Sequence, residues 1–460
     1  MSSIMGSLSI AVRAMMADQG ALQVVSNNVA NINTPGYTRE RANLVEEPPV
    51  QHGSPIEGNG VTLESVSSLR DRVLELRLDE EEQSKGKLDS YMEVMSQAQV
   101  YFNSGSGHDL GGVLNDFFSS LSQLSTDPTS MPFRQQVLMS AQNLAAEVSA
   151  DAKNLTGLQS QVDQTLTQQV QQAGQLLTQI AALNRQIGFN DSDEQNGALI
   201  DQRTQLIRNL SQLMDVRVVN NANGGISLTT GDGTSLIAGD RVASLSVHPD
   251  GDGKLRVFVD TTDVTDSLQG GSIRGLLDAR DQGIGGLLGQ LDEFAAGLSN
   301  ALNTAHQQGY TLSGAQGGNL MAPQATITGA AARMQVAITD PADIAASSDG
   351  SPGSNGNLNT LLALQNAAVV NGRTPSDAVA DIVFQAGSDV SNASAELDGE
   401  QAVLDQLDQQ RSSVSGVSLD EEAANMVRFQ RSYEAAARVI SIIDDLTLTV
   451  INIGTGGAVS

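Results

Sequence analysis

The sequence predicts a mainly α-helical protein with a small β part, in which helices at the two chain ends pair as a coiled coil. Both ends carry apolar residues spaced by fours and threes, which is the spacing of a coiled-coil seam. Long interior segments also have helical apolar spacing, whereas residues 216–268 alternate with a period of two. We therefore expect a long α-helical bundle as the body and one small antiparallel β subdomain.

The first helix begins near Ile4. Counting in steps of four and three, every seam position is apolar except Asp18, which either sets the register or lies at a less crowded layer. The apolar members of this N-terminal seam are Ile4, Leu8, Ala11, Met15, Leu22, Val25, Val29 and Ile32. The helix is predicted to end at residues 34–37, Thr-Pro-Gly-Tyr, because proline cannot continue a helix and Pro-Gly suits a type II turn.

A second heptad-patterned helix follows a capping box formed by Ser418 and Glu421. Counted from Leu419, its seam includes two residues that are not apolar, Glu422 and Thr447. The members of this C-terminal seam that we expect to act in assembly are Met426, Phe429, Tyr433, Ala436, Ile440, Ile443 and Val450. A helix with so narrow an apolar stripe cannot bury itself alone. We therefore expect the two terminal helices to pack together, within one chain or between subunits, as an inner domain of residues 1–45 and 419–460.

The segments between the terminal helices predict a mostly helical body of residues 46–215 and 269–418. Residues 38–62 are rich in proline and glycine, so they are expected to be an extended connector with room for one short strand. Helices are predicted at 69–103, 113–124, 132–187, 199–214 and 273–306, and within 357–411. Glycine-rich turns between the alternating runs of residues 216–268 predict the hairpins of the β subdomain.

Composition excludes several classes of function. The formal charge of −28 argues against nucleic acid as a partner, because a phosphate backbone would be repelled. No run of 18 apolar residues is present, so no membrane-spanning segment is expected, and no cleaved secretory signal is expected at the N-terminus. The chain has no cysteine, which excludes disulfides, thiol catalysis and thiolate metal sites.

No catalytic, cofactor-binding or metal-binding motif stands out, so we expect no enzyme activity. The pattern Asp250-x-Asp252-Gly lacks the other ligands of a calcium loop, and a turn between strands is the expected structure. The four histidines are far apart in sequence, and neither a nucleophile elbow nor a phosphate-binding loop occurs. A secreted cell-wall hydrolase would need two carboxylates converging in a cleft, and an adhesin-like module would need aromatic loops.

The segment NNVANINTPGY resembles the signature of the bacterial flagellar axial proteins, which include rod, hook and hook-associated proteins. Its positions in this chain are Asn27, Asn28, Ala30, Asn31, Thr34, Pro35, Gly36 and Tyr37. Three later stretches are similar to the hook-associated protein 1 (FlgK) family: GSIRGLLDARDQG from residue 271, ITDPADIAAS from 338, and VSLDEEAANMVRFQRSYEAAARVISIIDDL from 417. The resemblance therefore touches most of the chain.

This resemblance implies a structural subunit of the bacterial flagellum that forms the junction between hook and filament. Such a subunit is exported unfolded through the flagellar type III secretion channel, becomes ordered on assembly and ends outside the cell. The implied partners are other copies in a ring or tube, the hook protein, a second hook-filament junction protein, the flagellar export apparatus, and an export chaperone on the C-terminal helix. A hook or rod protein is the alternative, but it should lack the long bundle of residues 132–214.

The chain departs from larger family members in one respect, because only residues 216–268 could form an outward-facing domain.

Overall fold

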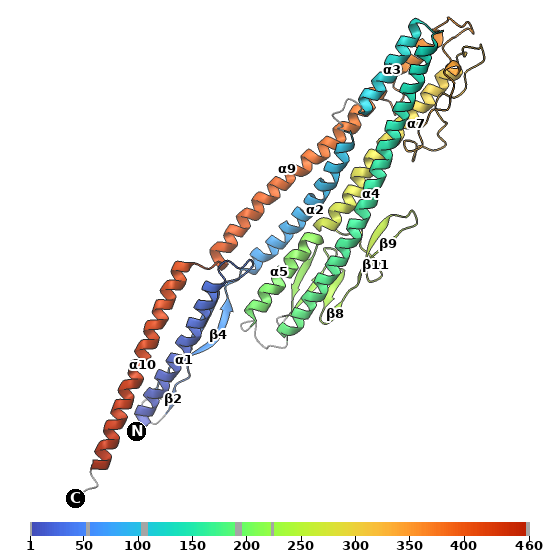
Figure 1. The fold of residues 1–460 in the computed structure, drawn as a ribbon. Coiled ribbons are helices and arrows are strands. Elements are labelled where there is room, and N and C mark those ends of the chain that lie inside the picture. Colours follow the sequence, from blue (N-terminus) through green and yellow to red (C-terminus); the bar gives the residue numbers. More distant parts are fainter. Residues whose placement is uncertain (1, 52–55, 103–108, 189–195, 222–224, 457–460) are drawn as a thin grey trace.

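Helices from the two chain ends, α1 (Ser2–Ala30) and α10 (Leu419–Gly456), lie side by side at one end of an elongated molecule (Figure 1). This computed structural model describes residues 2–51, 56–102, 109–188, 196–221 and 225–456. A helical body extends from the terminal pair, and both termini lie at the end remote from it. The predicted mainly α-helical fold class with paired terminal helices is confirmed.

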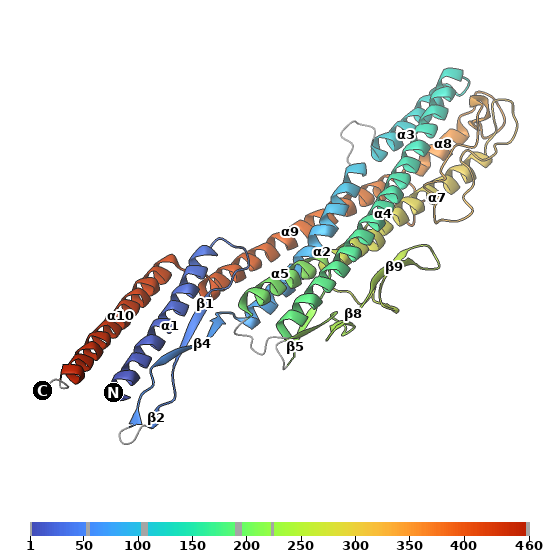
Figure 2. The same cartoon turned by 60° about the horizontal axis from the view of Figure 1, so that its bottom comes forward.

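The body is built from helices whose predicted positions are confirmed to within a few residues. They are α2 (Arg72–Phe102), α3 (Leu110–Thr126), α4 (Met131–Gly188), α5 (Gly197–Leu213), α6 (Gly271–Asp278), α7 (Gly285–Gln307), α8 (Gly356–Ala363) and α9 (Pro375–Ser415). A π-helical turn, η2 (Ala279–Ile284), separates α6 from α7 within the segment predicted as one helix. Two short 3-10 turns are η3 (Pro341–Asp343) and η4 (Leu364–Asn366). Figure 2 shows α2, α4, α5 and α9 running along the body.

The described residues contain four small antiparallel sheets, whereas the sequence predicted one. Two lie within the predicted β subdomain. The first has the order β5-β6-β7-β8 and the second the order β11-β10-β9. Their strands are β5 (Arg217–Asn220), β6 (Ile226–Thr229), β7 (Ser235–Ala238), β8 (Arg241–Val242), β9 (Leu245–Pro249), β10 (Leu255–Val259) and β11 (Thr262–Asp263). They contact the side of α4, so the β subdomain is an outgrowth of the helical body.

The other two sheets correct the prediction of an extended connector at residues 38–62. Strand β1 (Glu40–Glu46) pairs with β4 (Val61–Ser68), and β2 (Val50–Gln51) pairs with β3 (Ile56–Glu57). Pro48 and Pro49 lie between β1 and β2, where no ladder hydrogen bond requires their missing N–H groups. The prolines therefore separate the strands without interrupting them.

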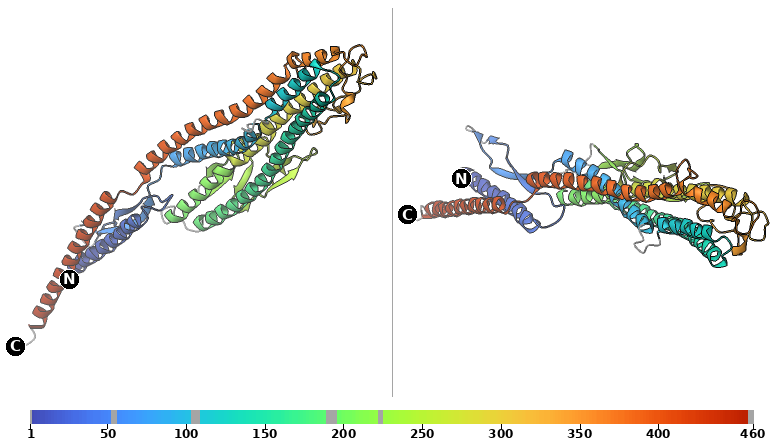
Figure 3. Two further views of the ribbon diagram at one scale, coloured as in Figure 1. Left: turned by 45° about the horizontal axis from the view of Figure 1, so that its top comes forward. Right: turned by 90° about the horizontal axis from the view of Figure 1, so that it is seen from above.

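This hairpin packs on α1, on a different side from α10 (Figure 3). A Cβ atom added to Gly20 would lie only 2.6 Å from Cδ2 of Leu63 on β4. Nearby, the Arg13 guanidinium donates a hydrogen bond of 3.1 Å to the carbonyl of Asn59. The first helix is thus held between α10 and a hairpin whose residues beyond 45 were predicted to belong to the body.

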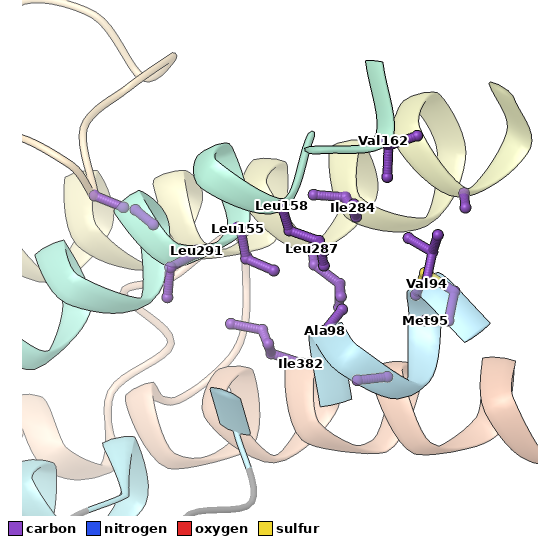
Figure 4. Packing of buried hydrophobic residues seen from close by; sticks show 14 of the residues in the cluster. Val94, Met95, Ala98, Leu155, Leu158, Val162, Ile284, Leu287, Leu291 and Ile382 are labelled. Atoms are coloured by element: carbon purple, nitrogen blue, oxygen red, sulfur yellow. The ribbon is translucent and has the colours of Figure 1, made fainter. Parts of the chain in front are cut away.

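The main hydrophobic core lies entirely in the body. Figure 4 shows its middle, where Leu155 and Leu158 of α4 meet Ile284, Leu287 and Met95. Within the described residues, the buried members of this cluster run from Val94 to Ala386, and none comes from α1 or α10. The terminal pair therefore forms without a share in this core.

Candidate functional site

The signature segment ends α1 at a place where three parts of the chain meet, and Asn28 is its center. The amide nitrogen Nδ2 of Asn28 donates to the carbonyl of Glu40 at 2.8 Å and to Oε2 of Glu422 at 3.2 Å. Its Oδ1 accepts from the Tyr37 hydroxyl and from the Glu40 N–H, both at 2.9 Å. An asparagine amide has two donor and two acceptor positions, so all four are used. The side chain is 1% exposed, which makes these bonds costly to lose.

Arg39 joins this asparagine to the start of α10. Its guanidinium pairs with Glu421 at 2.5 Å and with Glu422 at 2.7 Å, and its backbone N–H donates to the carbonyl of Ser415 at 2.9 Å. The Glu422 side chain is 1% exposed. A buried carboxylate is tolerated only when it is paired and hydrogen-bonded. Arg39 and Asn28 together therefore hold Glu422 at a seam position where the heptad pattern expects an apolar residue.

Asp201 of α5 connects the same segment to the body. Its carboxylate accepts from the Thr38 N–H at 3.0 Å and from the Thr38 hydroxyl at 2.7 Å, and it also pairs with Arg70. Burial raises the pKa of Tyr37 above its ordinary value, and nearby carboxylates raise it further, so the phenol keeps the proton that it donates to Asn28. We call this network the terminal junction; its members are Asn28, Tyr37, Thr38, Arg39, Glu40, Arg70, Asp201, Glu421 and Glu422.

The other signature residues shape the turn that leads into the junction. Asn31 donates to the carbonyl and Oδ1 of Asn27 at 3.0 Å, and its own Oδ1 accepts from the Thr34 hydroxyl at 3.1 Å. The Tyr37 N–H donates to the carbonyl of Thr34, and Gly36 has φ of 80°, as the third position of a type II turn requires. Ala30 and Pro35 are exposed, so they set the path of the chain rather than contribute polar side-chain contacts.

The structure brings the two predicted seams together within one chain. In the N-terminal seam Ala11 and Val25 are buried, and its other apolar members are partly buried. In the C-terminal seam Ala436 and Ile443 are buried and Val450 is 46% exposed; Met426, Phe429, Tyr433 and Ile440 are partly buried. Asp18 is 5% exposed, and its Oδ2 has no hydrogen-bond partner among the described residues.

Much of α10 remains uncovered and apolar. Val439, Ile442 and Leu446 follow one another at spacings of three and four, so they form a stripe on one side of the helix. They are 44%, 58% and 51% exposed. Other exposed apolar side chains at this end of the molecule are Met5, Ile10, Met16, Leu419, Val427, Leu448, Val450 and Ile451. An exposed apolar surface of this kind marks an interaction site.

A second charged cluster lies one level into the body. Glu75 of α2 accepts from Arg208 of α5 at 2.6 Å and from Arg411 of α9 at 2.9 Å, so one carboxylate connects three helices. Asp79, one turn further along α2, has an Oδ1 without a hydrogen-bond partner among the described residues. Burial raises the pKa of Asp79 to about 7, against the opposing charge of Arg208.

The raised pKa of Asp79 predicts that Asp79→Asn stabilises the protein at pH 8 by roughly 2 kcal/mol. The folded protein holds the proton up to about pH 7, whereas an unfolded aspartate loses it near pH 4. The stability that the neutral carboxyl contributes is therefore complete below pH 4 and is lost as the pH rises to about 7. Urea unfolding at pH 4 and pH 8 measures this difference; an equal gain at both pH values would contradict a protonated Asp79.

The described residues contain no group of three or more acidic or histidine side chains suited to hold a metal ion. Asp250 instead accepts from the N–H groups of Asp252 and Lys254 at 2.9 Å, which confirms the predicted turn between strands. Among the described residues, no helix has both the length and the apolar character needed to cross a membrane. The terminal junction is therefore the candidate functional site.

Comparison with known proteins matches the two chain ends that meet at this junction. Residues 8–38 match the family described as flagella basal body rod protein, and residues 408–453 match the C-terminal region of the flagellar basal body rod FlgEFG proteins. These two segments are α1 with its turn and α10 with the end of α9. Paired terminal helices, closed by the signature asparagine and attached to a helical body, define an axial protein of the bacterial flagellum.

The body identifies the branch of this class. Residues 95–321 match the helical domain of the flagellar hook-associated protein FlgK. Flagellar hook-associated protein 1 of Bacillus subtilis is 31% identical, over 99% of this chain and 99% of that protein, and that of Escherichia coli is 26% identical, over 96% and 98%. The chain belongs to the flagellar hook-associated protein 1 (FlgK) family, a family of structural flagellar proteins. Membership of this family excludes the alternative of a hook or rod protein. The long bundle of α4 and α5 agrees, because a hook or rod protein was expected to lack it.

The fold agrees with a solved structure. The flagellar hook junction protein FlgK from Burkholderia pseudomallei superposes with a TM-score of 0.66 at 18% identity, covering 74% of this chain and all of that one. Sequence reasoning found the signature and both seams but missed Arg39, Glu40, Asp201 and the role of Glu422. The one available signal was Glu422, an acidic residue at a seam position of α10, because a buried carboxylate needs a positively charged or hydrogen-bonding partner.

Proposed function

We propose that this chain forms the junction between hook and filament, as copies in a ring or tube, outside the cell. The observation that carries the proposal is the uncovered apolar stripe Val439, Ile442 and Leu446, beside a pair of helices that has no share in the main core. Burial of such a stripe against a neighbouring copy gains about 25 cal/mol for each Å² of apolar surface removed from water. The two seams and the signature residues are then the assembly residues of the subunit.

The same apolar stripe supports the proposed partners. Before assembly, α10 exposes a surface that favours aggregation, so an export chaperone that covers the C-terminal helix would protect it. After export through the flagellar apparatus, the hook protein would contact one side of the ring and a second junction protein the other. The ends would then become ordered as they are buried.

Ile442→Lys is expected to abolish filament formation without unfolding the protein. Lysine at this 58% exposed position leaves the α1 pairing intact but places a charge in the contact with the neighbouring copy. Cells that carry this variant should bear hooks without filaments and release flagellin into the medium, as cells lacking the gene should. Counting of filaments by electron microscopy measures the effect.

Ser441→Lys is the matched control, because it adds the same charge at the adjacent exposed position on another side of α10. It should leave motility close to that of the wild type. Both purified variants should unfold at the wild-type temperature. Normal filaments on cells with Ile442→Lys would contradict the role of the stripe in assembly.

Limited proteolysis of the purified chain is expected to remove roughly the first and last 40 residues before the body is cut. The reason is that none of the main buried core described here lies in α1 or α10, so opening these helices leaves that core intact and costs less than opening the body. Mass spectrometry of the early fragments locates the cuts. Terminal segments that resist cleavage as long as the body does would contradict ordering on assembly.

A further inference from the structure

A groove lies between α3 and α9. Helix α3 and the part of α9 beside it lie in the body, far from the terminal pair (Figure 1). The volume of the groove is about 420 Å³. Leu114 of α3 and Val379 of α9 are buried and form its floor. Gly111 and Ala380 also line the groove, and their small side chains leave it shallow. We propose that this groove docks one helix of another protein, with an apolar face between flanks of lysine and arginine.

The apolar half of the argument rests on Phe384. This side chain lines the groove and is 72% exposed, the highest value among the exposed large apolar residues in the described chain. Val383 beside it is only partly buried, and Val379 lies one turn earlier on the same side of α9. Aromatic anchors supply much of the binding energy of protein interfaces. Phe384 is therefore the expected anchor, and the shallow apolar floor receives side chains of the partner.

Charge selects the kind of partner. Helix α9 contains eight acidic residues and a single base, Arg411, which pairs with Glu75. On α9, next to lining residues of the groove, Asp377 is exposed and Asp381 pairs with Arg373 at 3.0 Å. A partner that covers Phe384 must bring positive charge to this acidic rim. A second copy of this chain, with a formal charge of −28, does not supply it.

The shape of the groove selects a helix. Two helices that pack side by side leave a furrow between their ridges, and a third helix fits that furrow with residues at positions i, i+3, i+4 and i+7. α9 packs on α2 and α7 elsewhere along its length, which leaves the side with Phe384 free in the described structure. The groove is thus distinct from the apolar stripe of α10 and does not depend on its role.

Two synthetic helical peptides test the proposal on the full chain. Both carry leucine at i, i+3, i+4 and i+7, and the flanks are lysine in one and glutamate in the other. The lysine peptide should bind in a fluorescence anisotropy titration, more weakly at high salt, and the glutamate peptide should not. Phe384→Ser should weaken binding about tenfold or more, whereas Val414→Ser, at a 51% exposed position of the same helix outside the groove, should not. The proposal would be overturned if the lysine peptide bound the Phe384→Ser variant as tightly as the wild type, or if both peptides bound equally well.

A photo-cross-linking residue at position 384, compared with one at 414, tests the same surface in flagellated cells. The expected product joins position 384 to a basic, amphipathic helical segment of a different protein, identified by mass spectrometry. A product with a second copy of this chain, or no product specific to position 384, would overturn the proposal. Because the peptide titration needs no assembled flagellum, its failure is distinguishable from failure of the proposed junction function.

Discussion

Asn28→Ala is expected to detach α10 from α1 and to prevent assembly of the subunit. The substitution removes four hydrogen bonds at once, from Tyr37, from both backbone groups of Glu40 and from Glu422. Each buried polar group left without a partner costs about 1–3 kcal/mol, and the Glu422 carboxylate costs more because it is charged. A loss on the order of 3–5 kcal/mol in the docking of α10 follows. Hydrogen exchange of the amides near the start of α10 measures it.

Two companion variants separate the donors of Asn28 from its size. Asn28→Asp keeps the shape but loses both donors and places a negative charge against Glu422, so it should be at least as harmful as alanine. Asn27→Ala removes an exposed neighbour whose only contact within the junction is a 3.3 Å bond to Glu40, and it should change stability by less than about 0.5 kcal/mol. Equal hydrogen exchange in Asn27→Ala and Asn28→Ala would show that the junction is not centered on Asn28.

The helices were predictable because their signals are local. Apolar residues recur along α4 with helical spacing, and its predicted range of 132–187 differs from Met131–Gly188 by one residue at each end. The terminal pairing was predictable for a related reason. Each terminal helix has a narrow apolar stripe that it cannot bury alone, and each can cover the other's stripe. Periodicity thus predicts which faces are buried even when it does not say what covers them.

The junction and the hairpin were not predictable in the same way. Arg39 and Glu422 are 383 residues apart in sequence, and no local pattern records a contact between them. Strands β1 and β4 are seven and eight residues long, and the proline-rich stretch between them dominated the prediction of a connector. Polar contacts between distant segments leave only an indirect mark on the sequence. In this chain the indirect sign was Glu422, an acidic residue at a heptad position that is normally apolar.

Gly275→Ala is expected to destabilise the body by about 3 kcal/mol or more. A Cβ atom at position 275 of α6 would lie 2.1 Å from the carbonyl oxygen of Lys87 on α2, and the nearest atoms are backbone, which cannot rotate away. The helices must therefore separate, and Leu276 and Leu277, both buried in the core, move with α6. Chemical unfolding of the full chain, followed by circular dichroism, measures the loss.

Gly289→Ala provides the control for helix propensity, because it makes the same chemical change in α7. Apart from the adjoining backbone of α7 itself, no heavy atom lies within 4 Å of a Cβ atom at position 289, so the alanine should stabilise the helix by about 0.5–1 kcal/mol. The opposite signs of two identical substitutions would locate the effect in the crossing of α2 and α6. This crossing fixes the direction in which α2 leaves the terminal junction, so a subunit with Gly275→Ala should also assemble poorly. A neutral Gly275→Ala would mean that the two helices do not approach through their backbones.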